Sequence, residues 1–280
     1  MGEYNIMKPQ NFDFYRPNTL EQTINLLSEL GDDGRVIAGG QSLMAMLNLR
    51  MVTTEALIDI SRLEELSYFK ETDKFLEVGA AVSQAELMDY PNLSEIQPLL
   101  AKALPSVGHF QTRNQGTVCG SLAHADPSSE LPLCLATLGG EVILQSTKGE
   151  RILSAAEFQT GMLETAIREN ELIVAARFPR SLPNAGYAFS EVARRHGDFA
   201  IVAIAGVACN GTFRLGVGGV AGQPTVREWK IEPEECDEVL NEFAWEMEGG
   251  DDIHATAQYR RQIVRKLGRK VLEEAKLCSK

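Results

Sequence analysis

Apolar residues recur at helical spacing near the start of the chain. Thr19 stands where a helix cap is expected, Gln22 follows three residues later, and Gly31 is typical of a helix end. Between them the apolar positions fall every three or four residues, which predicts a helix with one buried face. These positions are Leu20, Ile24, Leu27 and Leu30.

Two short apolar runs flank a second predicted helix. Residues 35–38 and 56–60 have the composition of buried strands, and residues 43–49 between them are predicted to be helical. Strand, helix and strand at this spacing predict a small parallel βαβ unit.

From residue 75 the pattern favours a mixed region. Residues 75–80 alternate like a strand, and Ser83 with Glu86 forms a capping box that opens a helix. A loop rich in small and polar residues is predicted over residues 109–132. The other elements predicted here are helices at 98–104 and 133–138 and strands at 141–145 and 172–178.

Pro179 and the stretch 181–184 form the best candidate domain boundary. Beyond it, Asn210-Gly211 is the strongest hairpin signal in the chain, and a final amphipathic helix is predicted over residues 255–276. Three successive strands are predicted in this part, over residues 187–192, 200–209 and 212–219.

Composition and charge favour a globular protein that does not bind nucleic acid. The chain has 280 residues, of which 44% are hydrophobic and 24% charged, and its net charge is −12. Such an acidic chain is a poor partner for nucleic acid or for anionic membranes. No apolar run approaches the roughly 18 residues that span a bilayer. The first six residues lack the pattern of a secretory signal.

The cysteines and histidines are scattered and predict no metal site. No Cys-x-x-Cys pair occurs among the five cysteines, which favours reduced thiols and a cytoplasmic location. His124 and Asp126 lie close in sequence, but two ligands do not make a metal site.

A glycine-containing segment, Gly39-Gly40-Gln41-Ser42, joins the predicted strand at 35–38 to the next helix. Glycines let backbone amides approach a ligand closely, and a helix N-terminus favours anions, so the segment suits a phosphate or pyrophosphate. It lacks the Gly-Lys-Ser/Thr of a Walker loop and the Gly-x-Gly-x-x-Gly dinucleotide fingerprint. A tight turn with a Ser cap is the alternative interpretation.

A second segment, residues 113–127, contains many hydrogen-bond donors and small residues. Long loops inside compact domains are often functional, and a simple surface excursion is the alternative. Together the two segments, in this order and at this separation, resemble the FAD-binding subunit of the molybdenum hydroxylases. These are the medium subunits of carbon monoxide dehydrogenase, xanthine dehydrogenase-like and N-heterocycle dehydrogenase complexes. The resemblance continues through residues 130–132, 191–200 and 259–261 and covers nearly the whole chain.

The resemblance implies an α+β fold in two domains. Residues 1–180 would form a two-part FAD-binding domain of the vanillyl-alcohol-oxidase (PCMH) type, with a βαβ subdomain over 1–60 and a second subdomain over 61–180. Residues 181–280 would form a small C-terminal α/β domain with a three-stranded antiparallel sheet and helices.

The resemblance also implies which residues bind the cofactor. In that family both glycine segments wrap the FAD pyrophosphate, and the stretch with Asp126 and Glu130 reaches the adenosine. Ile173 falls where an aliphatic residue lies near the flavin, and residues 194–200 would lie on the isoalloxazine side. Carried over, the pyrophosphate residues would be Ile37, Ala38, Gly39, Gly40, Gln41, Ser42, Leu43, Thr117, Val118, Gly120 and Ser121.

Two positions depart from the family pattern. Cys119 stands where the family often has Gly, which implies less room in the second segment. Ser190 stands where several relatives carry Lys near the flavin, which implies a different electrostatic environment.

The implied function is electron transfer within a heterotrimer. Substrate would react at molybdopterin on a large subunit, and electrons would pass through two iron–sulfur clusters on a small subunit to FAD here and then to an external acceptor. No catalytic residue, membrane span or nucleic acid is expected. The alternatives are a free-standing FAD-dependent oxidoreductase of the same fold, and a scaffold that has lost its cofactor.

Overall fold

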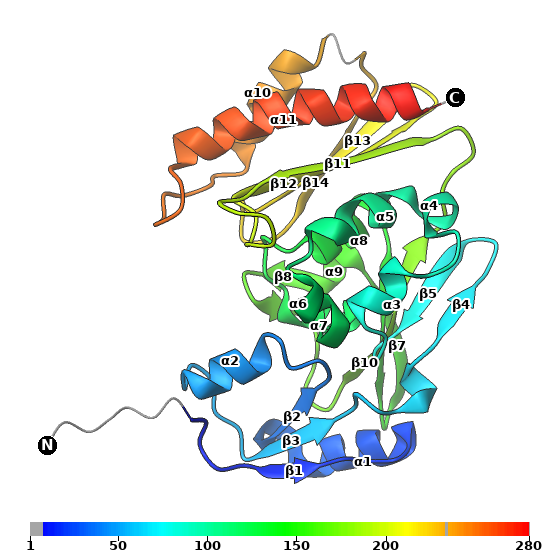
Figure 1. Cartoon of the computed structure of the whole chain (residues 1–280), viewed down its shortest axis with the longest axis vertical. Coiled ribbons are helices and arrows are strands. Elements are labelled where there is room, and N and C mark those ends of the chain that lie inside the picture. The colour runs from blue at the N-terminus through cyan, green and yellow to red at the C-terminus, as the bar shows by residue number, and fades with distance from the viewer. Residues whose placement is uncertain (1–7, 233–234, 280) are drawn as a thin grey trace, which may run out of the picture.

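The computed structural model describes residues 8–232 and 235–279. Figure 1 shows an N-terminal region at one end, a central region, and a C-terminal sheet with two helices at the other end. The prediction that the chain has no secretory signal rests on the first six residues, which lie outside the described ones.

The N-terminal region is a three-stranded parallel sheet with the strand order β1-β3-β2. The predicted βαβ unit is therefore confirmed, and β1 is a strand that the sequence analysis missed. The hydroxyl of Thr19 accepts from the backbone of Gln22 at 3.1 Å, as predicted, whereas the Gln22 side chain accepts from the backbone of Asn18. The elements are β1 (Asp13–Tyr15), α1 (Leu20–Leu30), β2 (Gly34–Ile37), α2 (Leu43–Asn48) and β3 (Ala56–Asp59).

The central region contains a five-stranded antiparallel sheet with the order β4-β5-β10-β6-β7. The predicted capping box of Ser83 and Glu86 is present at the start of α3. The strands are β4 (Phe69–Glu71), β5 (Phe75–Gly79), β6 (Glu141–Ser146), β7 (Gly149–Ser154) and β10 (Leu172–Pro179), with a separate pair β8 (Gln159–Gly161) and β9 (Glu164–Thr165). The helices are α3 (Gln84–Met88), α4 (Leu93–Ile96), α5 (Pro98–Ala103), α6 (Phe110–Gln115), α7 (Val118–His124), α8 (Glu130–Leu138) and α9 (Ala155–Phe158).

The long loop predicted over residues 109–132 is wrong, because α6, α7 and the first turn of α8 lie there. The hydroxyl of Thr117 caps α7 by accepting from the backbone of Gly120 at 2.9 Å. Val118, Cys119 and Leu122 are buried at the spacing of one helix face. Tertiary burial therefore makes a helix of small residues that, read alone, resemble a loop.

The C-terminal region is a four-stranded antiparallel sheet with the order β11-β12-β13-β14. The three predicted strands are confirmed, and β14 adds a fourth. Asn210 and Gly211 have φ values of 51° and 73°, which fits the predicted tight hairpin between β12 and β13. The elements are β11 (Gly186–Val192), β12 (Val202–Cys209), β13 (Thr212–Gly218), β14 (Thr225–Trp229), α10 (Cys236–Glu246) and α11 (Ala257–Cys278).

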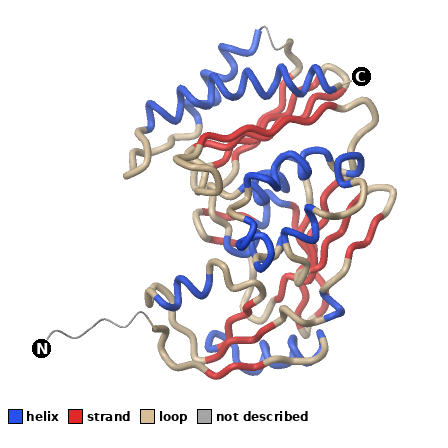
Figure 2. Tube along the Cα trace, viewed as in Figure 1, coloured by secondary structure: helices blue, strands red, loops and turns tan. Residues whose placement is uncertain are grey.

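The C-terminal sheet is buried on both faces. Figure 2 shows helices on each side of it: α10 and α11 cover one face, and the central helices α5 and α8 lie against the other. Ala203 and Ala205 of β12 belong to the central hydrophobic core, whereas Val202 and Ile204 belong to the core under α11. Among the described residues, no helix is long and apolar enough to cross a membrane.

The contact between β11 and α11 gives a stability prediction. A Cβ at Gly186 would lie 1.8 Å from the carbonyl oxygen of Ala275, so Gly186→Ala must push the strand and helix apart. We expect the free energy of unfolding to fall by about 1–3 kcal/mol in urea denaturation. Gly250→Ala is the matched control, because a Cβ there meets nothing within 4 Å. Equal stability of the two variants would contradict this packing.

Candidate functional site

The first glycine segment lies between β2 and α2 and leaves backbone donors free. Gly40 has a φ of 68°, which favours glycine, and its carbonyl accepts from Met44 as α2 begins. Within the described part of the chain, the backbone amides of residues 39–42 donate no hydrogen bond. Ser42 makes no capping hydrogen bond either, so the alternative of a turn closed by a Ser cap is not supported.

Backbone hydrogen bonds hold the second segment against residues 82–84, and the first segment approaches it closely. Val118 donates to the carbonyl of Val82 at 3.0 Å, and Gln84 donates to the carbonyl of Gly116 at 2.8 Å. Gly39 approaches this segment so closely that a Cβ there would lie 1.9 Å from the carbonyl oxygen of Gln115. The two glycine segments, which are far apart in sequence, therefore meet in space.

A cavity of about 750 Å³ lies where the two segments meet. Its volume is within the range of small-molecule and cofactor sites. The residues named from the sequence that line it are Ile37, Ala38, Gly39, Gly40, Gln41, Ser42, Leu43, Thr117, Gly120, Ser121 and Glu130.

Three of the named residues lie outside the lining. Val118, the first residue of α7, is fully buried, and Ile173 in β10 is 6% exposed. The carboxylate of Asp126 accepts from the backbone of Ser128 at 2.8 Å, which fixes the turn before α8. These side chains support the walls of the cavity rather than face it.

Cys119 also points away from the cavity. Its thiol lies 3.7 Å from the carbonyl oxygen of Val78 in β5, and burial raises its pKa to about 12. The loss of room that the sequence implied at this position is therefore wrong, because the helical turn directs the side chain into the core.

Several lining residues were not identified from their own sequence signal. Residues 163 and 165 and residues 167–171 contribute one side, and Val107, Gly108 and Thr112 another. Residues 197–199 of the C-terminal region also line the cavity, and they fall within the segment 194–200 that the resemblance places on the isoalloxazine side. Phe199 is 61% exposed, which is high for an aromatic side chain beside a cavity.

Two buried polar atoms in the lining lack a protein partner. They are Oε1 of Gln84 and Oδ1 of Asn170. Buried acceptors without a donor are costly and usually find one in a ligand or water. The cavity therefore presents free backbone donors on one segment and free acceptors elsewhere.

The buried Glu130, which lines the cavity, lies close to the half-buried Glu191, which does not line it. Burial raises the pKa of Glu130 to about 8, and the carboxyls of Glu191 and Asp126 add to the shift while its own backbone amide opposes it. Burial raises the pKa of Glu191 to about 7, against a hydrogen bond from Ser106. Glu130 is therefore protonated at neutral pH, so its carboxyl can donate as well as accept.

No group of three or more His, Cys, Asp or Glu that could hold a metal ion occurs among residues 8–232 and 235–279. His124 lines the cavity, but Asp126 does not.

Residues 10–181 match the family described as "FAD binding domain in molybdopterin dehydrogenase". The chain is 34% identical, over 96% of each chain, to the 6-hydroxypseudooxynicotine dehydrogenase complex subunit alpha of Paenarthrobacter nicotinovorans. It is 39% identical to the caffeine dehydrogenase subunit beta of a Pseudomonas species, over 69% of this chain and 66% of that one.

Among solved structures, the fold is similar to a chain of a Cu,Mo-containing CO dehydrogenase. The TM-score is 0.91 at 28% identity, and the match covers 97% of this chain and 99% of that one.

The polar groups of the cavity fit FAD: free amides suit its pyrophosphate, and unpartnered acceptors suit its hydroxyl and amino groups.

Glu130 gives a pH prediction. Between about pH 4.5 and 8 the folded chain holds a proton on Glu130 that the unfolded chain releases, so stability falls as pH rises. We expect this group to contribute a slope of up to about 1.4 kcal/mol per pH unit. Urea denaturation of the FAD-free chain across this range should show a shallower slope for Glu130→Gln. The exposed control Glu29→Gln should follow the wild type, and equal slopes for wild type and Glu130→Gln would contradict the shifted pKa.

Proposed function

The chain belongs to the family of FAD-binding domains in molybdopterin dehydrogenases, and from this membership we propose that it is the FAD-binding medium subunit of a multi-subunit molybdenum hydroxylase. In this role it passes electrons from iron–sulfur clusters on a partner to an external acceptor. The observation that carries the proposal is the cavity between the two glycine segments, with unused backbone amides on one wall.

FAD, when bound, accepts two electrons and releases them singly or in pairs, so it can connect one-electron clusters with a two-electron acceptor. The residues of this chain bind and orient it. We assign the pyrophosphate to residues 37–43 and to Thr117, Gly120 and Ser121, where backbone amides and hydroxyls line the cavity. The donors assigned here are neutral, and Arg35 and Arg168 also line the cavity.

The remaining polar groups orient the cofactor's hydroxyl and amino groups. Oε1 of Gln84 and Oδ1 of Asn170 accept hydrogen bonds, and the protonated carboxyl of Glu130 donates or accepts one. Val118, Asp126 and Ile173 act indirectly, by holding α7, the turn before α8 and β10 in place.

The isoalloxazine side is assigned to residues 197–199. Gly197 packs against the ring of His109, which fixes this segment over the central region. The exposed ring of Phe199 then offers a flat apolar surface at the cavity. Ser190 lies in β11, which contains no lysine, so this strand adds no positive charge on this side.

The partners follow from the function of related complexes. We propose a large molybdopterin subunit and a small subunit with two iron–sulfur clusters, assembled as a heterotrimer. We place the complex in the cytoplasm, because all five cysteines of this chain are free thiols.

We propose a domain boundary near residue 180. The family match ends at residue 181, and Pro179 ends β10. Residues 1–180 would then form the FAD-binding domain, divided near residue 60 after β3, and 181–280 the C-terminal domain.

Gly40 provides the test of the assigned pyrophosphate site. Gly40→Asp should abolish retention of FAD after desalting, because it adds a carboxylate to the segment assigned to the pyrophosphate. Gly40→Asn has the same size and tolerates a φ of 68°, so it should lose less FAD and thereby separates charge from strain. The readout is the flavin absorption per chain, which should be about one in the wild type. Full FAD retention by Gly40→Asp would show that the site is assigned wrongly.

The assembly is tested by purifying the tagged chain from its own host. We expect molybdenum, iron and two further subunits to copurify, and the flavin band to bleach on substrate addition only when those subunits are present. Turnover of a small substrate by the FAD-loaded chain alone would instead support a free-standing oxidoreductase. Assembly with the partners without any FAD would support a scaffold.

A further inference from the structure

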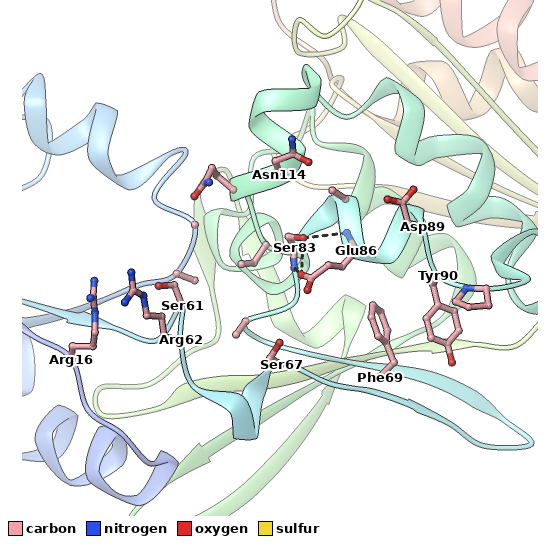
Figure 3. A pocket seen from close by; sticks show the side chains of 17 residues that line it. Arg16, Ser61, Arg62, Ser67, Phe69, Ser83, Glu86, Asp89, Tyr90 and Asn114 are labelled. Atoms are coloured by element: carbon pink, nitrogen blue, oxygen red, sulfur yellow. Dashed lines mark hydrogen bonds between the residues drawn. The ribbon is translucent and has the colours of Figure 1, made fainter.

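A second cavity, of about 1050 Å³, lies beside the first between the N-terminal and central regions. Both cavities have Ala38, Gly39 and Thr117 in their linings, and Gln115, whose carbonyl Gly39 approaches, lines the second one. We propose that this second cavity binds a ribonucleotide, separate from the FAD site and occupied at the same time. Figure 3 shows its side chains arranged in an order that matches phosphate, ribose and base.

One end of the cavity is cationic. Figure 3 shows Arg16 and Arg62 side by side at this end, next to Ser61. Arg16 is held by Asp59 at 2.7 Å, whereas Arg62 makes no hydrogen bond or ion pair within the described part of the chain. Asp59 neutralises only one of these two guanidinium groups. An unpaired guanidinium beside a paired one suits a phosphate, which it can bind through two parallel hydrogen bonds.

The opposite end is aromatic. The rings of Phe69 and Tyr90 lie 4.5 Å apart between centroids, inclined at 39°, and both side chains are half-buried. The hydroxyl of Tyr90 is hydrogen-bonded to Glu71, which fixes the orientation of the ring. A fixed aromatic pair at the edge of a cavity suits stacking by a nucleobase. Asp89 lies next to Tyr90 and can accept from an exocyclic amino group.

Hydroxyl and carboxylate groups occupy the space between the two ends. Ser67, Ser83 and Glu86 lie there in Figure 3. Oε2 of Glu86 accepts from the backbone and the hydroxyl of Ser83, both at 2.7 Å, so its second oxygen faces no protein donor. A carboxylate with a free oxygen suits the two hydroxyl donors of a ribose.

The order of these groups selects the ligand class. An inorganic anion would bind the arginines without contacting the aromatic end, and an apolar ligand would leave Arg62 unpaired. A nucleic-acid strand is disfavoured by the net charge of −12. A free nucleotide uses both ends and the polar groups between them.

Isothermal titration calorimetry on the FAD-saturated chain tests the proposal. ADP, added up to about 1 mM, should bind at one per chain without releasing flavin. Adenosine and inorganic pyrophosphate should each bind at least about tenfold more weakly, because each engages one end of the cavity. Arg62→Ala should weaken ADP binding about tenfold or more. Arg261→Ala, which removes an arginine that lies over Trp245 in the C-terminal region, should have no effect.

Tyr90 variants test the aromatic end. Tyr90→Phe keeps the ring and should retain ADP binding, whereas Tyr90→Ala should lose it while FAD retention stays unchanged. Four results would each overturn the proposal: no ADP binding, binding that neither Arg62→Ala nor Tyr90→Ala weakens, pyrophosphate binding as tight as ADP, or release of FAD by ADP. Loss of FAD in Arg62→Ala would assign this cavity to FAD itself and would equally overturn a separate nucleotide site.

Discussion

The approach of Gly39 to the carbonyl oxygen of Gln115 is the contact on which the site depends. It joins the parallel sheet of the N-terminal region to the antiparallel central region through backbone atoms, with no room for a side chain between them. Gly39 begins the run of free amides at residues 39–42 and Gln115 lies shortly before α7, so the contact sets the position of these amides relative to α7. Both cavities are lined by Gly39 beside this contact. A side chain at Gly39 would therefore disturb the N-terminal region, the central region and both cavities at once.

Local signals in the sequence were sufficient for much of the fold. The capping box at Ser83 and the hairpin at Asn210-Gly211 depend on contacts within a few residues, and the structure contains both. The parallel βαβ unit is also present, and its strands, which pair Gly34 with Ala56, were recognised from two apolar runs that flank a helix. The predictions of secondary structure failed where burial in the core, rather than local sequence, determines the element. Residues 118–124 are small and polar enough to resemble a loop, yet they form α7 because Val118, Cys119 and Leu122 pack into the core. The strands β1 and β14 are short edge strands: β1 pairs with β3, which is distant in sequence, whereas β14 pairs with the preceding strand β13.

The same distinction applies to the candidate site. The two glycine segments could be predicted, because close backbone approach to an anion requires small residues in a recognisable order. Residues 167–171 and Val107 carry no such signal, since they line the cavity only through tertiary packing. The predicted loss of room at Cys119 was wrong. Residues near it in sequence line the cavity, but successive side chains of a helix differ in direction by about 100°, so the Cys119 thiol lies towards β5.

An acidic chain that binds an acidic dinucleotide must avoid repulsion at close range, and the structure indicates how this chain does so. The donors assigned to the pyrophosphate are backbone amides, whose partial charges do not depend on pH or on the net charge of −12. The most deeply buried carboxyl in the cavity, Glu130, is neutral because burial and its acidic neighbours raise its pKa to about 8. Protonation of Glu130 therefore removes its repulsion of the ligand, and Arg35 and Arg168 add positive charge to the lining of the cavity. The cost is a site whose electrostatics change above neutral pH, when Glu130 loses its proton and places a negative charge beside a negatively charged cofactor.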